Sequence, residues 1–293
     1  MTNRHPAPGF LKIAHLSLVP LICVIAVLFS EQRAGAIVAG APTGPQRARN
    51  VGTLVVSGNG LPWIWAGCTV TLISPRVGVT AGHCIAFAYR LSPFTRIGVS
   101  FAHEHVFGAP LPADLEVHEG TDALHPDFKA VFGGGLPLQD LNDATLADVG
   151  AVVFNAPITG VLPARLPREG MLDTIADGPF DVGVVGYGTT SFAAATGKAP
   201  FDGGTRRFTT MAVDTVYPAV ATVSPAPGDT CALDSGGPAF NTVNGHVPPV
   251  VVTVYGLIVG PARAGQLCAG GTTIMRLDVP HISRWLRDMI AAF

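Results

Sequence analysis

The sequence predicts an all-β protein that ends in one α-helix. Its 293 residues include 35 glycines and 25 prolines, and many short runs of valine, isoleucine, threonine and phenylalanine lie between them. Runs of β-branched and aromatic residues separated by turn-forming residues are typical of strands. A helical pattern is clear only in residues 280–293, where Pro280 stands in the first turn. The apolar residues of that segment share one face, which comprises Ile282, Trp285, Leu286 and Met289.

The length and charge of the chain limit its organisation and its partners. A chain of 293 residues is long enough for one large domain or two modest ones, with a substantial core. Only 13% of the residues are charged, and the formal net charge is −2. Such a weak charge gives no indication of binding to nucleic acid or to an anionic membrane. We also expect no cofactor.

Residues 1–36 are predicted to form a secretory signal peptide. The basic residues Arg4 and Lys12 precede an apolar run at residues 16–30, and Ala34-Gly35-Ala36 offers an A-x-A cleavage site. The protein is therefore expected outside the cytoplasm, secreted or periplasmic. Because three basic residues and one acidic residue would leave with this segment, the mature chain would carry a formal charge of about −4.

An uncleaved membrane anchor is the alternative interpretation of this segment. The apolar run at residues 16–30 is short for a membrane span of about 20 residues, although residues 10–13 would lengthen it. If the signal peptide is removed, we expect no stable association with a membrane.

Four cysteines remain after Cys23 leaves with the signal peptide. An even number of cysteines in an exported chain is most simply explained by two disulfides, for which three pairings exist. Zinc is the alternative, but zinc sites usually include a short C-x₂₋₄-C pair, and these cysteines are spaced more widely. The four are Cys68, Cys84, Cys231 and Cys268.

A candidate nucleophile lies in GDTCALDSGGPAF at residues 228–240. The core of this stretch, DSGGP with Ser235 at its second position, looks like the surroundings of a nucleophilic serine. Upstream, residues 67–84 are predicted to form two strands joined by a turn, after which His83 stands beside Cys84. A lone histidine is most often a core or surface residue, so His83 becomes a catalytic candidate only together with the serine and an acid.

The acid is best sought in LADVGAVVFNAPI at residues 146–158. Asp148 comes directly before a short apolar strand, so its carboxylate would enter the interior at a strand end. A buried carboxylate is costly unless it is hydrogen-bonded, and an imidazole N–H is one suitable partner. The alternative is a turn aspartate, which is how we interpret Asp140 and Asp143.

The motifs TAGHC, ADVGAVVF and DSGGP, in the order His, Asp, Ser, resemble those of the chymotrypsin/trypsin family of serine endopeptidases. The similarity extends over nearly all of the chain after residue 36. It implies two six-stranded antiparallel β-barrels, the first over residues 37–165 and the second over residues 166–293 with the C-terminal helix. It also implies a monomer that acts on protein or peptide substrates.

The resemblance assigns catalytic roles to individual residues. Ser235 would attack the scissile carbonyl, His83 would accept its proton and pass it to the leaving amine, and Asp148 would orient the imidazole. The backbone N–H groups of Leu233 and Ser235 would stabilise the oxyanion. Glycine is usual in the family at the position of Leu233, where it accepts a positive φ. We expect the leucine to slow an enzyme without abolishing its activity.

IVAGAPTG, which starts at Ile37, is similar to the mature N-terminus of this family. The resemblance implies that the freed α-amino group of Ile37 pairs with Asp234 and thereby shapes the oxyanion hole. Because the predicted signal cleavage falls directly before Ile37, we hypothesise that signal peptidase itself creates this N-terminus. The alternative is that the segment is only a first strand. The family also implies two disulfides, Cys68–Cys84 and Cys231–Cys268.

Asp229 lies six residues before Ser235, where trypsin-like members have the floor of the specificity pocket. A carboxylate there would pair with a basic side chain, so we expect cleavage after Arg or Lys. A simple turn aspartate is the alternative. Thr272 or Thr273 would narrow this pocket and obstruct a long basic side chain, which makes a protease for apolar or small residues the runner-up.

Two further features leave alternatives open. His103 and His105 in FAHEHVF lie on the same side of a predicted strand, as metal ligands would, but an ordinary exposed strand gives the same alternation and we expect no metal. FGGGLPLQDLN at residues 132–142 is predicted to be a long surface loop, and the sequence leaves open whether it contacts a substrate or a partner. The alternative to an enzyme is a catalytically silent binding protein with the same fold.

Overall fold

The computed structural model describes residues 37–58, 60–90, 95–106, 110–129, 131, 140–175, 180–242, 244–263 and 266–293. The predicted signal peptide at residues 1–36 lies outside the described residues, as does most of the predicted surface loop at residues 132–142. Within the described ranges, no helix is both long enough and apolar enough to cross a bilayer.

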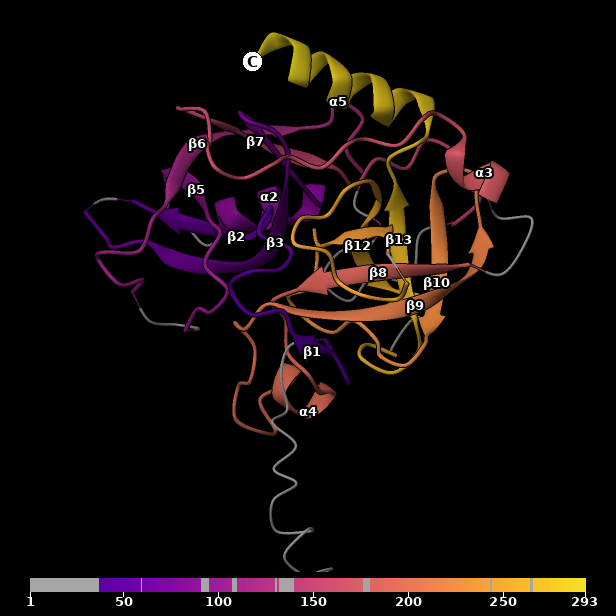
Figure 1. Cartoon of the computed structure of the whole chain (residues 1–293), viewed down its shortest axis with the longest axis horizontal. Coiled ribbons are helices and arrows are strands. Elements are labelled where there is room, and N and C mark those ends of the chain that lie inside the picture. Colours follow the sequence, from indigo (N-terminus) through magenta and orange to yellow (C-terminus); the bar gives the residue numbers. More distant parts are fainter. Residues whose placement is uncertain are drawn as a thin grey trace, which may run out of the picture. The chain divides into compact units, whose positions relative to one another are not determined.

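Six antiparallel strands close the first barrel in the order β2-β3-β4-β7-β6-β5 (Figure 1). These strands are rich in valine, isoleucine and threonine, as the sequence predicts. β2 is buried at every position, so both of its faces are covered. The bounds are β2 Val51–Ser57, β3 Ile64–Ser74, β4 Val77–Thr80, β5 Arg96–Ser100, β6 His118–Leu124 and β7 Gly150–Phe154.

The second barrel is a ring of six further strands, β8-β9-β10-β13-β12-β11, which closes through the pairing of β8 with β9. The short strand β1 pairs with β9 at the edge of this barrel. The predicted fold of two six-stranded antiparallel barrels is therefore confirmed. The bounds are β1 Ala41–Pro42, β8 Asp181–Gly186, β9 Arg207–Val216, β10 Val220–Pro225, β11 Pro238–Asn241, β12 Val254–Pro261 and β13 Thr272–Arg276.

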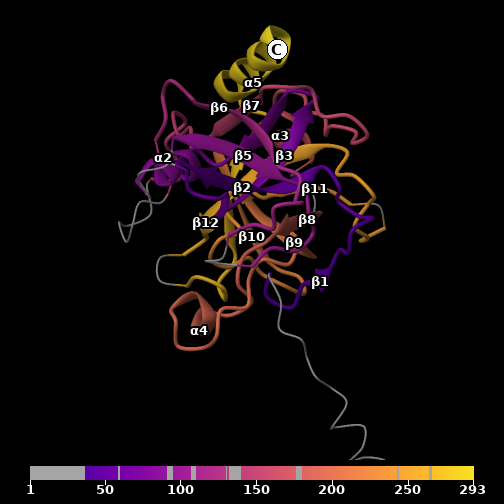
Figure 2. The same ribbon diagram turned by 90° about the vertical axis from the view of Figure 1, so that its left-hand side faces the viewer.

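The predicted C-terminal helix is α5, Pro280–Ala292, with Ile282 and Leu286 on its buried face. It lies beside β6 and β7 in both views (Figures 1 and 2). Three shorter helices were not predicted, because four to nine residues are too few to show a helical period. They are α2 Gly82–Arg90, α3 Met171–Ile175 and α4 Phe192–Ala195.

The strand predicted over FAHEHVF is wrong. Within the described residues 101–106, Glu104 forms an isolated β-bridge with Thr205 and no regular strand is present. The N–H of His105 donates to the carbonyl of Gly204 at 2.9 Å. The backbone of this segment forms hydrogen bonds with the residues that lead into β9. The segment therefore links the two barrels and is not a strand of either one.

Candidate active site

His83 lies in the first turn of α2, which follows β4. The disulfide between Cys68 and Cys84 ties this turn to β3, so the histidine is held at the edge of the first barrel. The side chain of His83 is 23% exposed. One side of the imidazole is therefore open to a ligand while the other side faces the protein.

Asp148 is fully buried just before β7, and its carboxylate accepts three hydrogen bonds. Its Oδ1 accepts the backbone N–H of His83 at 2.7 Å. Its Oδ2 accepts Nδ1–H of His83 at 2.9 Å and the backbone N–H of Val131 at 3.0 Å. These donors offset the cost of burying the charge. Asp140 and Asp143 are turn aspartates instead, since each accepts a backbone N–H from two residues further on.

Burial and the charge of Asp148 act in opposite directions on His83. Burial lowers the pKa of the imidazole, whereas the charge and the hydrogen bond of Asp148 raise it, and the pKa ends above its usual value. Because Nδ1 donates to the carboxylate, the neutral ring has its free lone pair on Nε2. His83 is thus arranged as a base whose acceptor nitrogen points away from Asp148.

The backbone of Ser235, in the loop before β11, is docked against the first barrel. The N–H of Thr69 donates to the carbonyl of Ser235 at 2.8 Å. The next residue, Gly236, lies so close to Thr80 Oγ1 and to the carbonyl of Thr69 that a Cβ there would clash with both. Thr80 is three residues before His83, so the serine loop lies against the segment that leads into α2. Among the described residues, the Ser235 hydroxyl makes no hydrogen bond, and such bonds are often long in substrate-free sites.

Leu233 has the conformation that glycine usually provides. Its φ is +75°, in the left-handed region that costs a residue with a Cβ about 1–2 kcal/mol. The side chain packs against Gly67, where a Cβ would approach Leu233 Cδ2 to 2.9 Å. Gly67 thus makes room for the leucine. In the described part of the chain, the N–H groups of Leu233 and Ser235 have no hydrogen-bond acceptor, so both are available to an oxyanion.

Asp234 is fully buried between these two residues. Its carboxylate accepts the backbone N–H groups of Gly188 and Cys231, each at 2.8 Å. Burial raises the pKa of Asp234 to about 7; the two hydrogen bonds oppose this rise, and the nearby Asp229 adds to it. The carboxylate has no cationic partner among the described residues. The ionised form of Asp234 is therefore disfavoured in the intact chain.

Ile37 contributes to the interior of the second barrel. Its side chain is fully buried among residues of β8, β9 and β10, and the carbonyl of Val38 accepts the N–H of Asp229 at 3.1 Å. In the intact chain the nitrogen of Ile37 belongs to a peptide bond with Ala36 and carries no charge. The predicted ion pair with Asp234 thus needs cleavage before Ile37, and it stays a prediction.

Asp229 is 2% exposed, and donors occupy both of its oxygens. Oδ1 accepts the backbone N–H of Thr230 at 2.8 Å and the hydroxyl of Thr272 at 3.1 Å. Oδ2 accepts the N–H of Gly271 at 2.9 Å. Of the two threonines expected to narrow the pocket, Thr272 contacts this carboxylate directly, whereas Thr273 donates to a carbonyl of β12.

The second disulfide joins Cys231, in the loop before Ser235, to Cys268, which precedes β13. Both disulfides have the pairing that the family resemblance implied. The hydroxyl of Thr189 lies 3.0 Å from the sulfur of Cys231. The loop that carries Asp229, Leu233 and Ser235 is thereby anchored to the segment that leads into β13.

The structure gives no support for a metal at His103 and His105. Burial lowers the pKa of His105 to about 4, and its ring packs on Tyr187 with centroids 5.5 Å apart. Within the described ranges, neither histidine belongs to a group of three ligand-type side chains close enough together to hold a metal ion. The one cluster of ligand-type residues found there contains His83 with Cys68 and Cys84, whose sulfurs are already joined in a disulfide.

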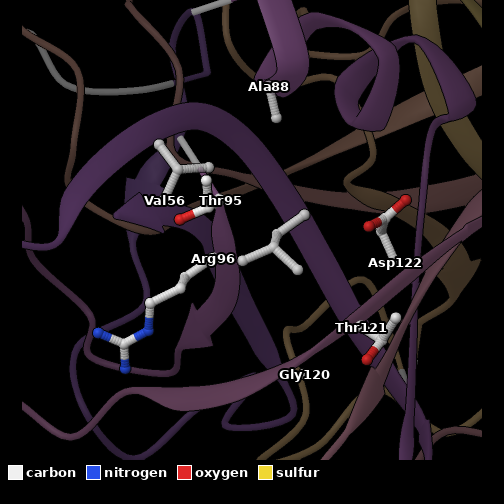
Figure 3. Close-up of a pocket in the computed structure, with 8 residues that line it drawn as sticks. Val56, Ala88, Thr95, Arg96, Gly120, Thr121 and Asp122 are labelled. Atoms are coloured by element: carbon white, nitrogen blue, oxygen red, sulfur yellow. The ribbon is translucent and has the colours of Figure 1, made fainter. Parts of the chain in front are cut away.

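A pocket of about 140 Å³ opens on the first barrel, and no candidate site residue lines it (Figure 3). The Arg96 side chain extends away from Asp122 in Figure 3 and pairs with Glu119 through two hydrogen bonds of 2.8 and 2.6 Å. This pocket therefore lies apart from the candidate active site. It is lined by Val56, Ala88, Thr95, Arg96, Ile97, Gly120, Thr121 and Asp122.

Comparison with known proteins identifies the fold. No family model matches the chain, and no curated protein sequence matches it. Among solved structures it is similar to HL collagenase with a TM-score of 0.60 and 16% identity, over 87% of this chain and 99% of the collagenase chain. The fold is that of trypsin-like serine proteases. At this identity the similarity demonstrates a shared fold and does not extend to the activity.

Two contributions to the candidate site had no signal in the sequence. The donor from Val131 is a backbone N–H, which any residue except proline supplies. The room for Leu233 comes from Gly67, 166 positions earlier in the chain. Nothing in the sequence marks Gly67 as the neighbour of Leu233, because this contact is visible only in the structure.

Proposed function

We propose that the chain is an exported serine endopeptidase that hydrolyses peptide bonds with Ser235, His83 and Asp148. The observation that carries the proposal is the joint arrangement of these residues. Asp148 holds the His83 ring through a 2.9 Å hydrogen bond. The Ser235 carbonyl accepts a hydrogen bond from Thr69, which adjoins Cys68, the cysteine whose disulfide anchors α2. The trypsin-like fold supports the same conclusion.

The proposed mechanism is acyl transfer to the serine followed by hydrolysis of the acyl-enzyme. Ser235 Oγ adds to the scissile carbonyl carbon while its proton passes to His83 Nε2, and the carbonyl oxygen becomes an oxyanion. The unpaired N–H groups of Leu233 and Ser235 stabilise that oxyanion. The C–N bond then breaks as Nε2 returns the proton to the leaving amine. Water cleaves the resulting ester by the same two proton transfers, and Asp148 remains ionised throughout.

For specificity, we propose cleavage after basic residues, with lysine favoured over arginine. An ionised carboxylate offers about four acceptor positions, and three donors already bond to Asp229. One position on Oδ2 is left. A single position suits the compact ammonium of lysine, whereas the guanidinium fork of arginine requires an acceptor on each oxygen.

Export and processing complete the proposal. Two disulfides suit an oxidising compartment outside the cytoplasm. Signal peptidase cleavage before Ile37 would free its α-amino group, which the family resemblance pairs with Asp234, a buried carboxylate that has no cationic partner among the described residues. Protein or peptide substrates and a monomeric state are part of the same proposal. N-terminal sequencing of the exported protein tests it, since any start other than Ile37 would reject this route of activation.

The proposed chemistry is tested by intact-mass analysis after exposure to a fluorophosphonate probe. We expect one adduct on the wild type and on Ser224→Ala, which alters a serine on β10 outside the candidate site, and none on Ser235→Ala. Absence of an adduct on folded wild type that begins at Ile37 would instead support the catalytically silent binding protein.

A further inference from the structure

The segment from His125 to Val131, which follows β6, packs directly against the pair formed by His83 and Asp148. The N–H of His125 donates to the carbonyl of Val149 at 3.1 Å, and the N–H of Phe128 closes a turn onto the carbonyl of His125 at 2.9 Å. The segment therefore starts on the residue next to Asp148 and turns back towards it.

Phe128 covers the residue before His83. A Cβ on Gly82 would lie 2.5 Å from Cδ2 of the Phe128 ring and 3.0 Å from the nitrogen of Val149. Real Cβ atoms do not approach so closely, so the ring fits only because residue 82 is glycine. Phe128 thus fixes the distance between the segment and the first turn of α2.

Val131 completes the contact. Its side chain is fully buried in the core of the first barrel, and its N–H donates to Asp148 Oδ2 at 3.0 Å. The same oxygen accepts the His83 ring N–H. Two donors on one oxygen and one on the other leave the carboxylate little freedom to rotate, since rotation would break all three bonds.

A second set of contacts holds this segment from outside. The ammonium group of Lys129 donates to Asp143 Oδ2 at 3.2 Å and to Thr145 Oγ1 at 2.7 Å. Asp143 and Thr145 lie on the stretch that returns to Asp148. Lys129, two residues before Val131, is therefore tied to the stretch that leads into Asp148.

We propose that Val131 is a positioning residue for the proposed protease, and that its main-chain N–H holds the Asp148 carboxylate on the ring of His83. The inference rests on the proposed function. Val131 lies behind Asp148 and acts through it, so it is not itself a catalytic residue. The connection between β6 and β7 thereby supports the site, in addition to its predicted role as a surface loop.

The test compares the loss of the N–H with the loss of the side chain. Val131→Pro lacks the N–H, whereas Val131→Ala keeps it and loses only packing. Removing a donor leaves the carboxylate charge less compensated, so we expect the pKa of His83 in Val131→Pro to rise by about half to one pH unit. The rate of fluorophosphonate labelling should fall about tenfold or more. Val131→Ala should keep both values and show only a lower melting temperature.

The pKa of His83 is measured by NMR titration of its ring signals. His125 and His281 pack behind the Asp148 segment, with ring centroids 5.5 Å apart, and their signals in the same spectra control for a general change of structure. Burial lowers the pKa of His125, and this value should not move in either variant. The titration needs no turnover, so it remains informative even if the wild type fails to react with the probe.

An unchanged or lowered His83 pKa in a folded Val131→Pro protein would overturn the proposal, as would equal shifts in the proline and alanine variants. If Val131→Pro does not fold, an ester in place of the peptide bond at residue 131 removes the same N–H without the proline ring. We expect the same rise in the His83 pKa there, and its absence would overturn the proposal as well.

Discussion

The two halves of the candidate site differ in how well their charges are satisfied. On the first barrel, Asp148 is buried but has three N–H donors, one of which is the ring of a histidine that can become a cation. On the second barrel, Asp234 is equally buried but has two N–H donors and no cation among the described residues, and its pKa is raised to about 7. The first half is complete in the intact chain, whereas the second half lacks one positive charge. Activation by a freed α-amino group would supply it.

The largest effect should come from Asp234 in a chain that still has residues before Ile37. With a folded pKa of about 7 against an ordinary value of about 3.9, the folded state keeps a proton that the unfolded state releases. The stability due to this proton is full below about pH 4 and is lost as the pH rises through 7, by on the order of 4 kcal/mol. Urea unfolding at pH 5 and pH 8, on a Ser235→Ala background that removes the proposed nucleophile, measures the part of this loss that falls between those pH values, about 2.5 kcal/mol.

Asp234→Asn isolates this effect. The pKa of His83 is also raised, so its contribution is likewise lost with rising pH, but the substitution removes only the Asp234 part. In the extended chain we expect Asp234→Asn to flatten the pH dependence at little cost. In a chain that begins at Ile37 the same change should cost about 3–5 kcal/mol, because it leaves a buried ammonium without a partner. Equal costs in the two forms would contradict the proposed ion pair.

The parts of the fold that the sequence predicts well are those that depend on neighbouring residues in the chain. An all-β body and a C-terminal helix follow from the strand-like runs and the pattern of residues 280–293, because these features are local in the chain, whereas the two barrels were implied by the motif resemblance alone. His83 and Asp148 were proposed as site residues partly because each adjoins a recognisable strand, and the structure brings their side chains into hydrogen-bond contact. The strand over FAHEHVF failed because alternation at His103 and His105 does not reveal that the backbone pairs with residues 204 and 205.

The parts of the site that sequence does not predict are its backbone donors and its close contacts. The N–H of Val131 reaches Asp148 only through a turn whose residues carry no motif. The fit of Leu233 against Gly67 joins residues from different barrels. The placement of Thr272 on the Asp229 carboxylate, and not of Thr273, depends on the register between β12 and β13, where the pairing shifts by one residue between Ile258 and Gly260.

An intermediate effect is expected at Asp229, the proposed floor of a specificity pocket. Thr272→Ala removes one donor from Asp229 Oδ1 and frees an acceptor for a guanidinium fork. We expect the ratio of kcat/KM for arginine over lysine substrates to rise about tenfold, the value of one hydrogen bond to a charged group. Thr273→Ala is the matched control, because that hydroxyl donates to the carbonyl of Pro261. A similar rise in both variants would show that Asp229 does not set the preference.

The smallest effect should come from Leu233, whose strain and packing oppose each other. Leu233→Ala loses the contact with Gly67 but keeps the positive φ, which still costs about 1–2 kcal/mol. Leu233→Gly loses the same contact and relieves that cost. We therefore expect the glycine variant to be more stable than the alanine variant by about 1 kcal/mol, the reverse of the usual order, in urea unfolding. Its rate of fluorophosphonate labelling should stay within about tenfold of the wild type, because the N–H of residue 233 is already unpaired. An alanine variant as stable as the glycine variant would mean that the chain relaxes away from the positive φ once the leucine is gone, and that the leucine contact itself keeps this half of the site in shape.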